Sequence, residues 1–414
     1  MKKSEIKKKL LKEIDRLKNK KYGFIAAGMP SYNRLFGRDS LITSWQLLDL
    51  EPEIAKNTLK ILAKYQGKEV ITAKEEEPGK ILHEHQIGKK RHPQSCFPFP
   101  YYGSVDSTPL FLILFSFYYK KTCLGKDSRT GGEKLDKKTK TGEREGERVA
   151  IETGDTEFLK KYWKNVLLAL HWVFHFGDKD GDYFLEYERK AKKGLFHQGW
   201  KDGFGDHLKI KPPVAVVEVQ GYQYLALIDI AKIAGDFFGD GKLEKSLRER
   251  AEGLRINFNK KFWMEKEKYF AFALDGEKEQ VKEITSNPGH LLFTGILDKN
   301  KEKFVVKKLF SPELWTPFGI RTHSIKSKFF DPLSYHLGSV WPHDNWLIAQ
   351  GLKKLGYKKE YREIKKALLR AYKRLGLIPE FYAVLDGKIT LKTRQTPCYP
   401  QAWATGALLN FLFN

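Results

Sequence analysis

Residues 214–233 read VAVVEVQGYQYLALIDIAKI, a run in which apolar side chains occur on almost every side of a helix. A second run of this kind, TPLFLILFSF, covers residues 108–117. A helix that lacks a polar face has to be enclosed by protein, because no side of it is suited to water. The two segments therefore predict central helices that are surrounded by other helices.

The remaining helical segments include several that carry a charged face. Residues 242–262 and 359–375 place Lys, Arg and Glu along one side, as is typical of a solvated outer helix. Short alternating pieces near 183–187 and 269–273 predict local hairpins, and few other strands are expected. Helical periodicity is found at 4–18, 39–49, 52–66, 106–121, 155–176, 214–235, 242–262, 287–297, 300–309, 339–355, 359–375 and 401–413.

About a dozen helices with few strands predict an all-α fold, an (α/α)6 barrel with six inner helices ringed by six outer ones, over a single domain of 414 residues. We expect four glycines of the inner set to permit close approach of the helices: Gly221, Gly289, Gly338 and Gly406. Residues 124–150 break the pattern, since they are rich in Lys, Glu, Gly and Thr and contain no aromatic residue. This composition predicts a disordered surface insertion.

The net charge of +24 comes from lysines that are spread over helix faces and tails. Many have a Glu three or four positions away, as Lys366 has Glu363, which favours solvated faces over a nucleic-acid site. Three cysteines without CxxC spacing, Cys96, Cys123 and Cys398, indicate neither a disulfide framework nor a zinc site. No run is long enough to span a membrane and no apolar signal core is present, so we expect a cytoplasmic protein.

Two carboxylates lie in aromatic-rich segments that are far apart in the sequence. Asp202 occurs in WKDGFG (200–205), at the predicted mouth of a helix, and Glu380 occurs in IPEFY (378–382). Hydrolysis of a glycosidic bond needs one carboxylic acid to protonate the leaving oxygen and one carboxylate to activate water. Burial beside Trp200 and Phe204 would raise the pKa of Asp202, as an acid that works near neutral pH requires. The alternatives are a helix N-cap for Asp202 and a loop salt bridge for Glu380.

Polar clusters fall at or near the starts of the predicted helices. In a helical barrel the loops that lead into the inner helices converge at one end, so these clusters would line one pocket. His83 and His85 are two residues apart and would point in different directions on a helix, which argues against zinc, and no cofactor is implied. The clusters are FGRDS (36–40), HEH (83–85), YYGSVDS (101–107), EVQGY (218–222), SNPGH (286–290), YHLGSVWPHDN (335–345) and CYPQAW (398–403).

The order of these motifs resembles the glucosidase domain of the glycogen-debranching amylo-α-1,6-glucosidase family. The resemblance runs from about residue 30 to the C-terminus and is more distant to the glucoamylase and processing α-glucosidase groups, which share an (α/α)6 barrel. It implies an inverting α-glucosidase that acts on a small-molecule or oligosaccharide substrate. The motifs that carry it are FGRDS (36–40), PGKILHE (78–84), YYGSVDSTPL (101–110), GWKD (199–202), EVQGY (218–222), SNPGHLL (286–292), SYHLGSVWPHDN (334–345), PEF (379–381) and PQAWATGA (400–407).

The resemblance also implies roles for individual residues. Asp202 matches the general acid of the family and Glu380 its general base. Arg38 and Asp39 match residues that grip the non-reducing-end sugar, although Asp39 could equally cap its helix. Trp341 would be a stacking platform, and Trp403 is either platform or core. The other expected substrate contacts, or residues that bracket the acid, are Glu84, Asp106, Trp200, Lys201, Glu218, Gln220, His343 and Asp344.

Two departures from the family pattern leave alternatives open. The segment after GWKD is one residue longer than usual, which makes Asp206 a second candidate for the acid. Many members carry an N-terminal β-rich domain that this sequence lacks, so a preference for branched glucan does not carry over. The alternatives are a hydrolase of another small α-glycoside, such as a glucosylated polyol or glycerate, an acidic-glycan hydrolase or lyase, an inactive carbohydrate-binding scaffold, and a nucleic-acid binder with salt-sensitive affinity.

Overall fold

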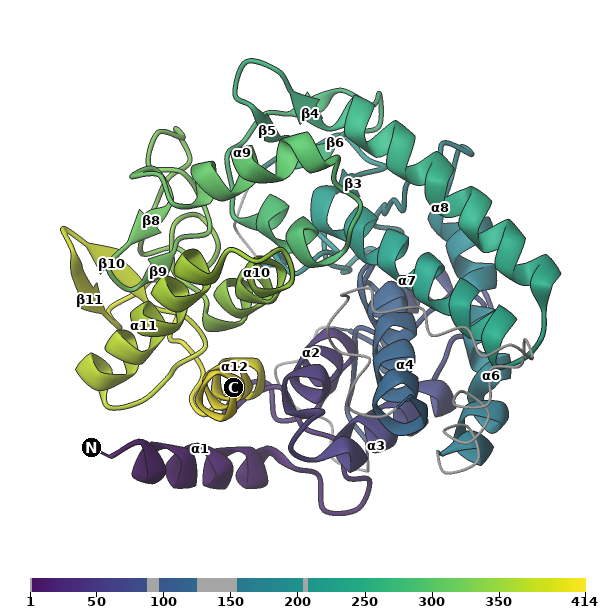
Figure 1. The fold of residues 1–414 in the computed structure, drawn as a ribbon, viewed down its shortest axis with the longest axis horizontal. Coiled ribbons are helices and arrows are strands. Elements are labelled where there is room, and N and C mark those ends of the chain that lie inside the picture. Colours follow the sequence, from purple (N-terminus) through teal and green to yellow (C-terminus); the bar gives the residue numbers. More distant parts are fainter. Residues whose placement is uncertain (1, 88–96, 125–154, 204–207) are drawn as a thin grey trace, which may run out of the picture.

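Two concentric layers of helices form the protein in the computed structural model, which describes residues 2–87, 97–124, 155–203 and 208–414 (Figure 1). Each inner helix packs against the next one along the chain, and the last packs against the first, which closes a ring. The inner layer consists of α2 (Gly37–Leu47), α4 (Ser107–Cys123), α7 (Val217–Asp236), the 3-10 helix η4 (Asn287–Phe293), α10 (Pro342–Lys354) and α12 (Ala402–Phe413).

Six outer helices lie around this ring and alternate with the inner ones in sequence (Figure 1). The arrangement confirms the predicted (α/α)6 barrel. The outer helices are α1 (Lys3–Leu17), α3 (Pro52–Lys64), α6 (Thr156–Trp172), α8 (Gly241–Lys261), α9 (Lys299–Leu309) and α11 (Lys358–Leu375).

Burial separates the two layers as the sequence patterns predict. Every residue of η4 is buried, and α12 buries nearly all of its length. Helix α11 instead buries one stripe and leaves its Lys- and Arg-rich side in water. Its buried residues follow the i, i+3, i+4, i+7, i+8 spacing of an amphipathic helix: Ile364, Ala367, Leu368, Ala371 and Tyr372.

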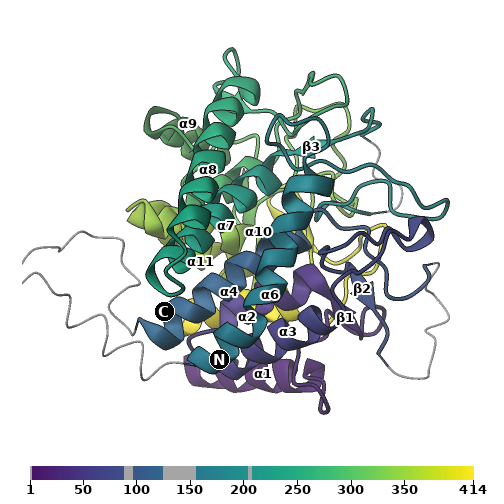
Figure 2. The same cartoon turned by 90° about the vertical axis from the view of Figure 1, so that its right-hand side faces the viewer.

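The described strands are short, antiparallel and in several cases lead straight into an inner helix: β1 continues into α2, and β3 into α7. Figure 2 shows β1, β2 and β3 together at one end of the barrel, away from the two termini. The pairs are β1 (Leu35–Phe36) with β2 (Glu84–His85), β4 (Trp263–Met264) with β5 (Tyr269–Phe270), β8 (Trp315–Thr316) with β9 (Gly319–Ile320), β10 (Ala383–Leu385) with β11 (Lys388–Thr390), and the ladder β3 (Ala215–Val216), β6 (Ala273–Leu274), β7 (Gln280–Val281).

Most predicted helix boundaries lie within a few residues of the observed ones, and the larger differences have local causes. The helix predicted at 287–297 is a 3-10 helix that ends at Phe293, shortly before Gly295, whose φ of +88° is left-handed. The helix predicted at 155–176 continues beyond Trp172 as the π-helical turn η3 (Val173–Gly177).

The hairpin predicted at 183–187 is wrong, because Tyr183 has a φ of +77° and only Tyr187 forms a bridge, to Val214. The segment 269–273 instead joins two real hairpins, β4–β5 and β6–β7. The His-Glu-His triplet lies at strand β2 and not on a helix. Apart from Leu124, the insertion predicted at 124–150 lies outside the described residues.

Three of the four glycines expected to allow close helix approach do so. A Cβ atom at Gly289 would lie 2.6 Å from Ile348 of α10, and similar contacts would arise at Gly221 and Gly406. The prediction for Gly338 is wrong in one respect, since this residue precedes α10 in a loop, where its Cβ would meet Phe330.

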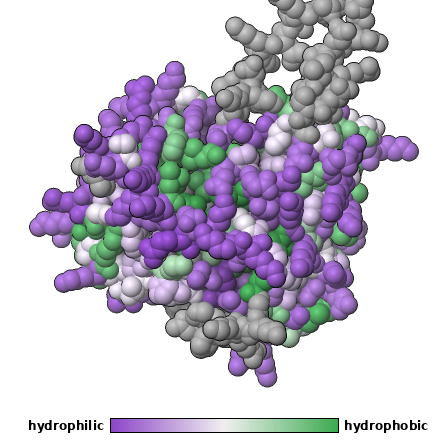
Figure 3. Space-filling model, turned by 90° about the horizontal axis from the view of Figure 1, so that it is seen from below, coloured by the Kyte–Doolittle hydropathy of each residue, from purple (hydrophilic) through white to green (hydrophobic). Residues whose placement is uncertain are grey.

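Hydrophilic side chains dominate the face seen from below, and a patch of hydrophobic ones interrupts them (Figure 3). Lysines on the outer helices pair with neighbouring acids, as Lys366 does with Glu363 at 3.0 Å. Among the described helices, none combines the length and apolar character that crossing a bilayer would require.

Candidate active site

A cavity of about 400 Å³ lies among the loops that lead into the inner helices. Residues from distant parts of the chain meet on its wall, and they include both candidate catalytic carboxyls. Of the residues predicted for the site, the cavity is lined by Arg38, Asp39, Glu84, Trp200, Asp202, Trp341 and Glu380.

Asp202 lies in a loop and is held by the guanidinium of Arg38. Nη1 of Arg38 donates to Oδ2 of Asp202 at 2.9 Å, and Nε of Arg38 donates to Asp106 at 2.6 Å. Burial raises the pKa of the Asp202 carboxyl, and the charge of Arg38 opposes this rise. About a fifth of the Asp202 side chain remains exposed, at 19%, so the carboxyl faces the cavity. It is therefore placed to exchange a proton with a bound ligand.

Glu380 is held at both of its oxygens. The hydroxyl of Tyr335 donates to Oε1 at 2.6 Å, and the backbone N–H of Cys398 donates to Oε2 at 3.0 Å. Burial raises the pKa of Glu380 to about 7, against the effect of these two donors. The carboxylate thus has a fixed orientation and a pKa in the range in which a general base operates.

Of the structural alternatives for these two residues, the N-cap role of Asp202 concerns a helix that would begin at residue 203, and residues 204–207 lie outside the described part of the chain. The loop salt bridge for Glu380 is not observed among the described residues. The described partners of Glu380 are a hydroxyl and a backbone N–H rather than a cation. Asp206, the second candidate for the acid, lies outside the described residues.

Asp39 and Trp341 also lie on the cavity wall. Asp39 is in the first turn of α2, which begins earlier than predicted, and accepts a hydrogen bond from Gln401 at 3.1 Å. Burial raises its pKa to about 7. Trp341 is only 1% exposed and lies nearly parallel to Phe381 and His336, so little of its face is free for a sugar. Trp341 is therefore mainly a part of the cavity wall, with little ring surface available for stacking on a sugar.

Six predicted residues lie behind the wall. Asp106 accepts a hydrogen bond from Arg38, and the Lys201 ammonium donates to the carbonyl of Thr322 at 2.7 Å.

The remaining predicted residues are used inside the helical core. Asp344 forms a hydrogen bond with His290 at 2.7 Å, and His343 stacks on Trp403 with ring centroids 3.7 Å apart. The side-chain amide of Gln220 forms hydrogen bonds with the backbone N–H and carbonyl of Leu185. Glu218 is fully buried in α7. Trp403 is both core and wall, being 4% exposed and lining the cavity.

Several residues of the wall were not singled out by the sequence analysis. Tyr335 orients Glu380, and Arg34 forms an ion pair with Glu84 at 2.5 Å. Tyr32 also faces the cavity, as does His83, which the sequence analysis weighed only as a metal ligand. Burial lowers the pKa of His83 well below its usual value, which keeps the imidazole neutral. Tyr335 stands within the quoted motif SYHLGSVWPHDN, so its position was available as a signal. Arg34 lies outside every motif quoted above, so the sequence analysis had no pattern that pointed to it.

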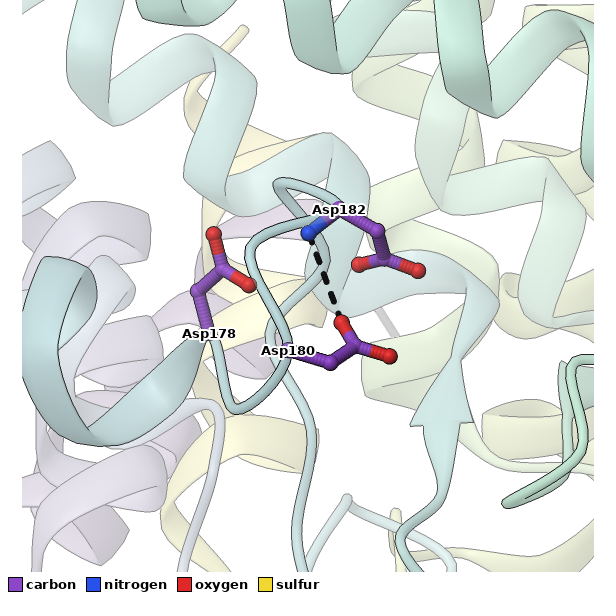
Figure 4. A group of neighbouring side chains, drawn as sticks. All are labelled: Asp178, Asp180 and Asp182. Carbon is purple, nitrogen blue, oxygen red and sulfur yellow. Dashed lines mark hydrogen bonds between the residues drawn. The ribbon is translucent and has the colours of Figure 1, made fainter.

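A group of three aspartates outside the cavity, Asp178, Asp180 and Asp182, has the spacing of a cation site (Figure 4). Two protein cations already contact it. The ammonium of Lys278 contacts Asp180 at 2.9 Å and Asp182 at 2.8 Å, and Arg250 contacts Asp178 at 2.6 Å. Among the described residues this is the sole cluster of at least three potential ligands, and each of its carboxylates already pairs with a protein cation.

The helical toroid is of the six-hairpin type, and the paired carboxyls in its cavity are the groups that a glycoside hydrolase uses. The chain belongs to the mannosylglycerate hydrolase MGH1-like glycoside hydrolase domain family, which it matches over residues 171–396. That match includes both Asp202 and Glu380. Among curated proteins, none matches the chain.

Solved structures with the same fold include the GH63 mannosylglycerate hydrolase from Thermus thermophilus in complex with Tris. It is 14% identical, with a TM-score of 0.68, and the alignment covers 99% of this chain and 100% of that one. The complex of that enzyme with Tris and D-glycerate has 14% identity, a TM-score of 0.66 and coverage of 99% of both chains. An uncharacterized conserved protein from the same organism has 15% identity, a TM-score of 0.69 and coverage of 99% and 100%. The resemblance to debranching enzymes is thus confirmed for the fold and for the glycosidase class, and not for debranching.

Proposed function

We propose that the protein hydrolyses small α-linked hexosides from the non-reducing end with inversion, with Asp202 as the general acid and Glu380 as the general base. The observation that carries the proposal is the presence of both carboxyls on the wall of one cavity, each with a raised pKa. Paired carboxyls of this kind are what glycosidic hydrolysis requires.

The catalytic step follows from the two environments. Asp202 donates its proton to the glycosidic oxygen as the bond to the anomeric carbon breaks. Glu380 removes a proton from a water molecule, whose oxygen attacks the anomeric carbon from the opposite face. Tyr335 and the N–H of Cys398 hold Glu380 in place for this role. Asp202 has to be protonated at the start, and its burial favours that form, whereas Arg38 stabilises the carboxylate that remains after proton donation.

Two substrate classes fit the proposal. The motifs shared with amylo-α-1,6-glucosidases favour an α-1,6-linked glucoside such as isomaltose. The match to an MGH1-like family favours a hexoside with a small aglycone, such as a hexosylglycerate or a hexosylated polyol. The cavity volume of about 400 Å³ favours short substrates over polymers in both classes.

The test is release of free hexose from a panel that contains isomaltose, panose, maltose, limit dextrin, α-glucosylglycerate and α-mannosylglycerate. Wild type is compared with Asp202→Asn and Glu380→Gln, and with the control Glu252→Gln, whose carboxyl is exposed on outer helix α8. We expect each active-site variant to lose about 100- to 10,000-fold in kcat. Proton NMR of the first product should show the β-anomer.

Release of the α-anomer would exclude inversion. Full activity in either active-site variant would exclude the assigned roles. If no member of the panel is hydrolysed by the folded protein, the inactive carbohydrate-binding scaffold becomes the better description.

A further inference from the structure

The ion pair between Arg34 and Glu84 lies on the cavity wall and has no part in the proposed proton transfers. Nε of Arg34 lies 2.5 Å from Oε2 of Glu84, and Nη1 donates to the carbonyl of Ser31 at 2.9 Å. Both side chains are buried, at 8% and 2% exposure. Among the described residues, Nη2 of Arg34 and Oε1 of Glu84 have no hydrogen-bond partner. The pair thus offers one donor and one acceptor side by side.

The position of the pair relates it to the leaving group. Glu84 pairs with Phe36 in the β1–β2 ladder, and α2, which carries Arg38, begins directly after Phe36. Arg38 in turn holds Asp202. Glu84 and Asp202 also line the same cavity. Because the general acid protonates the leaving oxygen, the aglycone lies on this side of the cavity.

The charges of the wall disfavour an anionic aglycone there. The two arginines among the described lining residues are both compensated, Arg34 by Glu84 and Arg38 by Asp106 and Asp202. The other carboxyls of the described wall are Asp39 and Glu380. Among the described residues of the wall, a carboxylate brought into this cavity would lose its hydration and meet acids rather than an uncompensated cation, which is costly.

We propose that the Arg34–Glu84 pair selects a neutral polyhydroxylated aglycone, a polyol or a sugar, over one that carries a carboxylate. One hydroxyl of a vicinal diol donates to Oε1 of Glu84, and the other accepts from Nη2 of Arg34. The inference rests on the proposed function, because it concerns the aglycone half of the same substrate. It distinguishes this chain from a hydrolase whose substrate, like mannosylglycerate, carries a carboxylate.

The test uses two pairs of substrates that differ only in a hydroxymethyl group or a carboxylate. These are α-glucosylglycerol with α-glucosylglycerate, and α-mannosylglycerol with α-mannosylglycerate. We expect kcat/KM of the wild-type enzyme at pH 7 to be at least about 10-fold higher for the preferred glycerol compound than for its glycerate partner. Equal rates, or a preference for the glycerate, would overturn the inference and leave the proposed glycosidase function standing.

The variant Glu84→Gln tests the role of the pair itself. It keeps the shape of the side chain but leaves the Arg34 cation uncompensated, so the glycerol-to-glycerate ratio should fall by about 10-fold or more toward the acid. Glu252→Gln is the matched control and should keep the wild-type ratio. An unchanged ratio in folded Glu84→Gln would overturn the assignment to this pair.

The wild-type ratio requires no variant, so the inference is tested even if Glu84→Gln does not fold. Hydrolysis of neutral disaccharides without hydrolysis of any of the four glycerol and glycerate compounds would support a neutral sugar as the aglycone. Absence of hydrolysis of every substrate, including the disaccharides, would overturn the proposed function and this inference with it.

Discussion

The guanidinium of Arg38 lies 2.9 Å from the Asp202 carboxyl, and this contact ties the candidate acid to the first turn of α2. The family resemblance implied a sugar-binding role for Arg38. In the structure this side chain lines the cavity and bridges Asp202 and Asp106, with Ser104 donating to the other oxygen of Asp106 at 2.7 Å. We therefore propose that Arg38 positions the acid.

Replacement of Arg38 should change both the pH dependence and the stability. Arg38→Lys keeps the charge but cannot bridge two carboxyls, so we expect kcat to fall about 10- to 100-fold. Because Arg38 lowers the pKa of Asp202, Arg38→Gln should raise that pKa and move the basic limb of the kcat/KM profile to higher pH. It also leaves two buried acids unpaired, which should cost about 3–5 kcal/mol in the free energy of unfolding.

The measurements for Arg38 are pH–rate profiles and denaturant unfolding. Arg248→Lys, an exposed replacement on α8, is the matched control and should change neither. A basic limb that stays in place in a folded, active Arg38→Gln would show that Arg38 does not set the pKa of the acid.

The Glu380 pKa of about 7 predicts the acidic limb of the kcat/KM profile. The base has to be ionised, so activity should decline as pH falls below about 7. The hydroxyl of Tyr335 lowers the pKa of Glu380, so Tyr335→Phe should raise it and move this limb upward. A shift of about one pH unit is expected for one lost hydrogen bond. Tyr361→Phe, on outer helix α11, is the control, and a shift downward in Tyr335→Phe would contradict the assignment.

Glu380→Gln should be more stable than wild type at neutral pH. A carboxyl whose pKa is raised from 4.5 to about 7 holds its proton in the folded state at pH values where the unfolded state has lost it. Its contribution to stability therefore declines as pH rises through this window. The glutamine can accept from the N–H of Cys398 and donate to the Tyr335 oxygen. We expect a gain of about 1–3 kcal/mol at pH 8 that vanishes near pH 4.5, measured by urea unfolding. A gain that is independent of pH would contradict this account.

Divalent cations should not stabilise the wild-type protein. Each of the carboxylates of Asp178, Asp180 and Asp182 already contacts Lys278 or Arg250, so a metal would have to displace these two cations. Thermal unfolding with millimolar calcium, or with EDTA, should give the same Tm within a degree or so. Lys278→Met should lower the stability by about 2–4 kcal/mol, because it leaves several partly buried acids without their cation. A rise in Tm of several degrees with calcium in the wild type would contradict the prediction.

Gly289→Ala should destabilise the inner ring. The new Cβ would lie 2.6 Å from Ile348, so η4 and α10 would have to separate. We expect a loss of about 1–3 kcal/mol in the free energy of unfolding. Gly241→Ala, at the start of α8, is the matched control, since a Cβ there meets nothing within 4 Å. Equal stability of the two variants would show that the ring tolerates wider spacing.

Local pattern predicted the two layers of helices well, because burial depends on whether a helix has a polar face. Most of the enclosed run at 214–233 lies in α7, which begins at Val217, and the amphipathic run at 359–375 lies in α11. Pattern failed at 183–187, where alternating side chains indicated a hairpin, because the left-handed φ of Tyr183 interrupts the extended chain. A left-handed backbone angle depends on contacts with other parts of the chain, and the alternation of polar and apolar residues carries no information about those contacts.

The sequence by itself determined the class of the fold and pointed to the two carboxyls to which we assign the proposed chemistry, since helix periodicity and an acid among aromatic residues are local properties. Only the tertiary structure decided which polar residues share the cavity with them. Glu84 and Glu218 both stood in motifs near predicted helix starts, yet Glu84 lines the cavity beside Arg34 while Glu218 is enclosed in α7. Packing of the inner helices sets the direction in which each side chain points, and that direction depends on contacts between segments far apart in the chain.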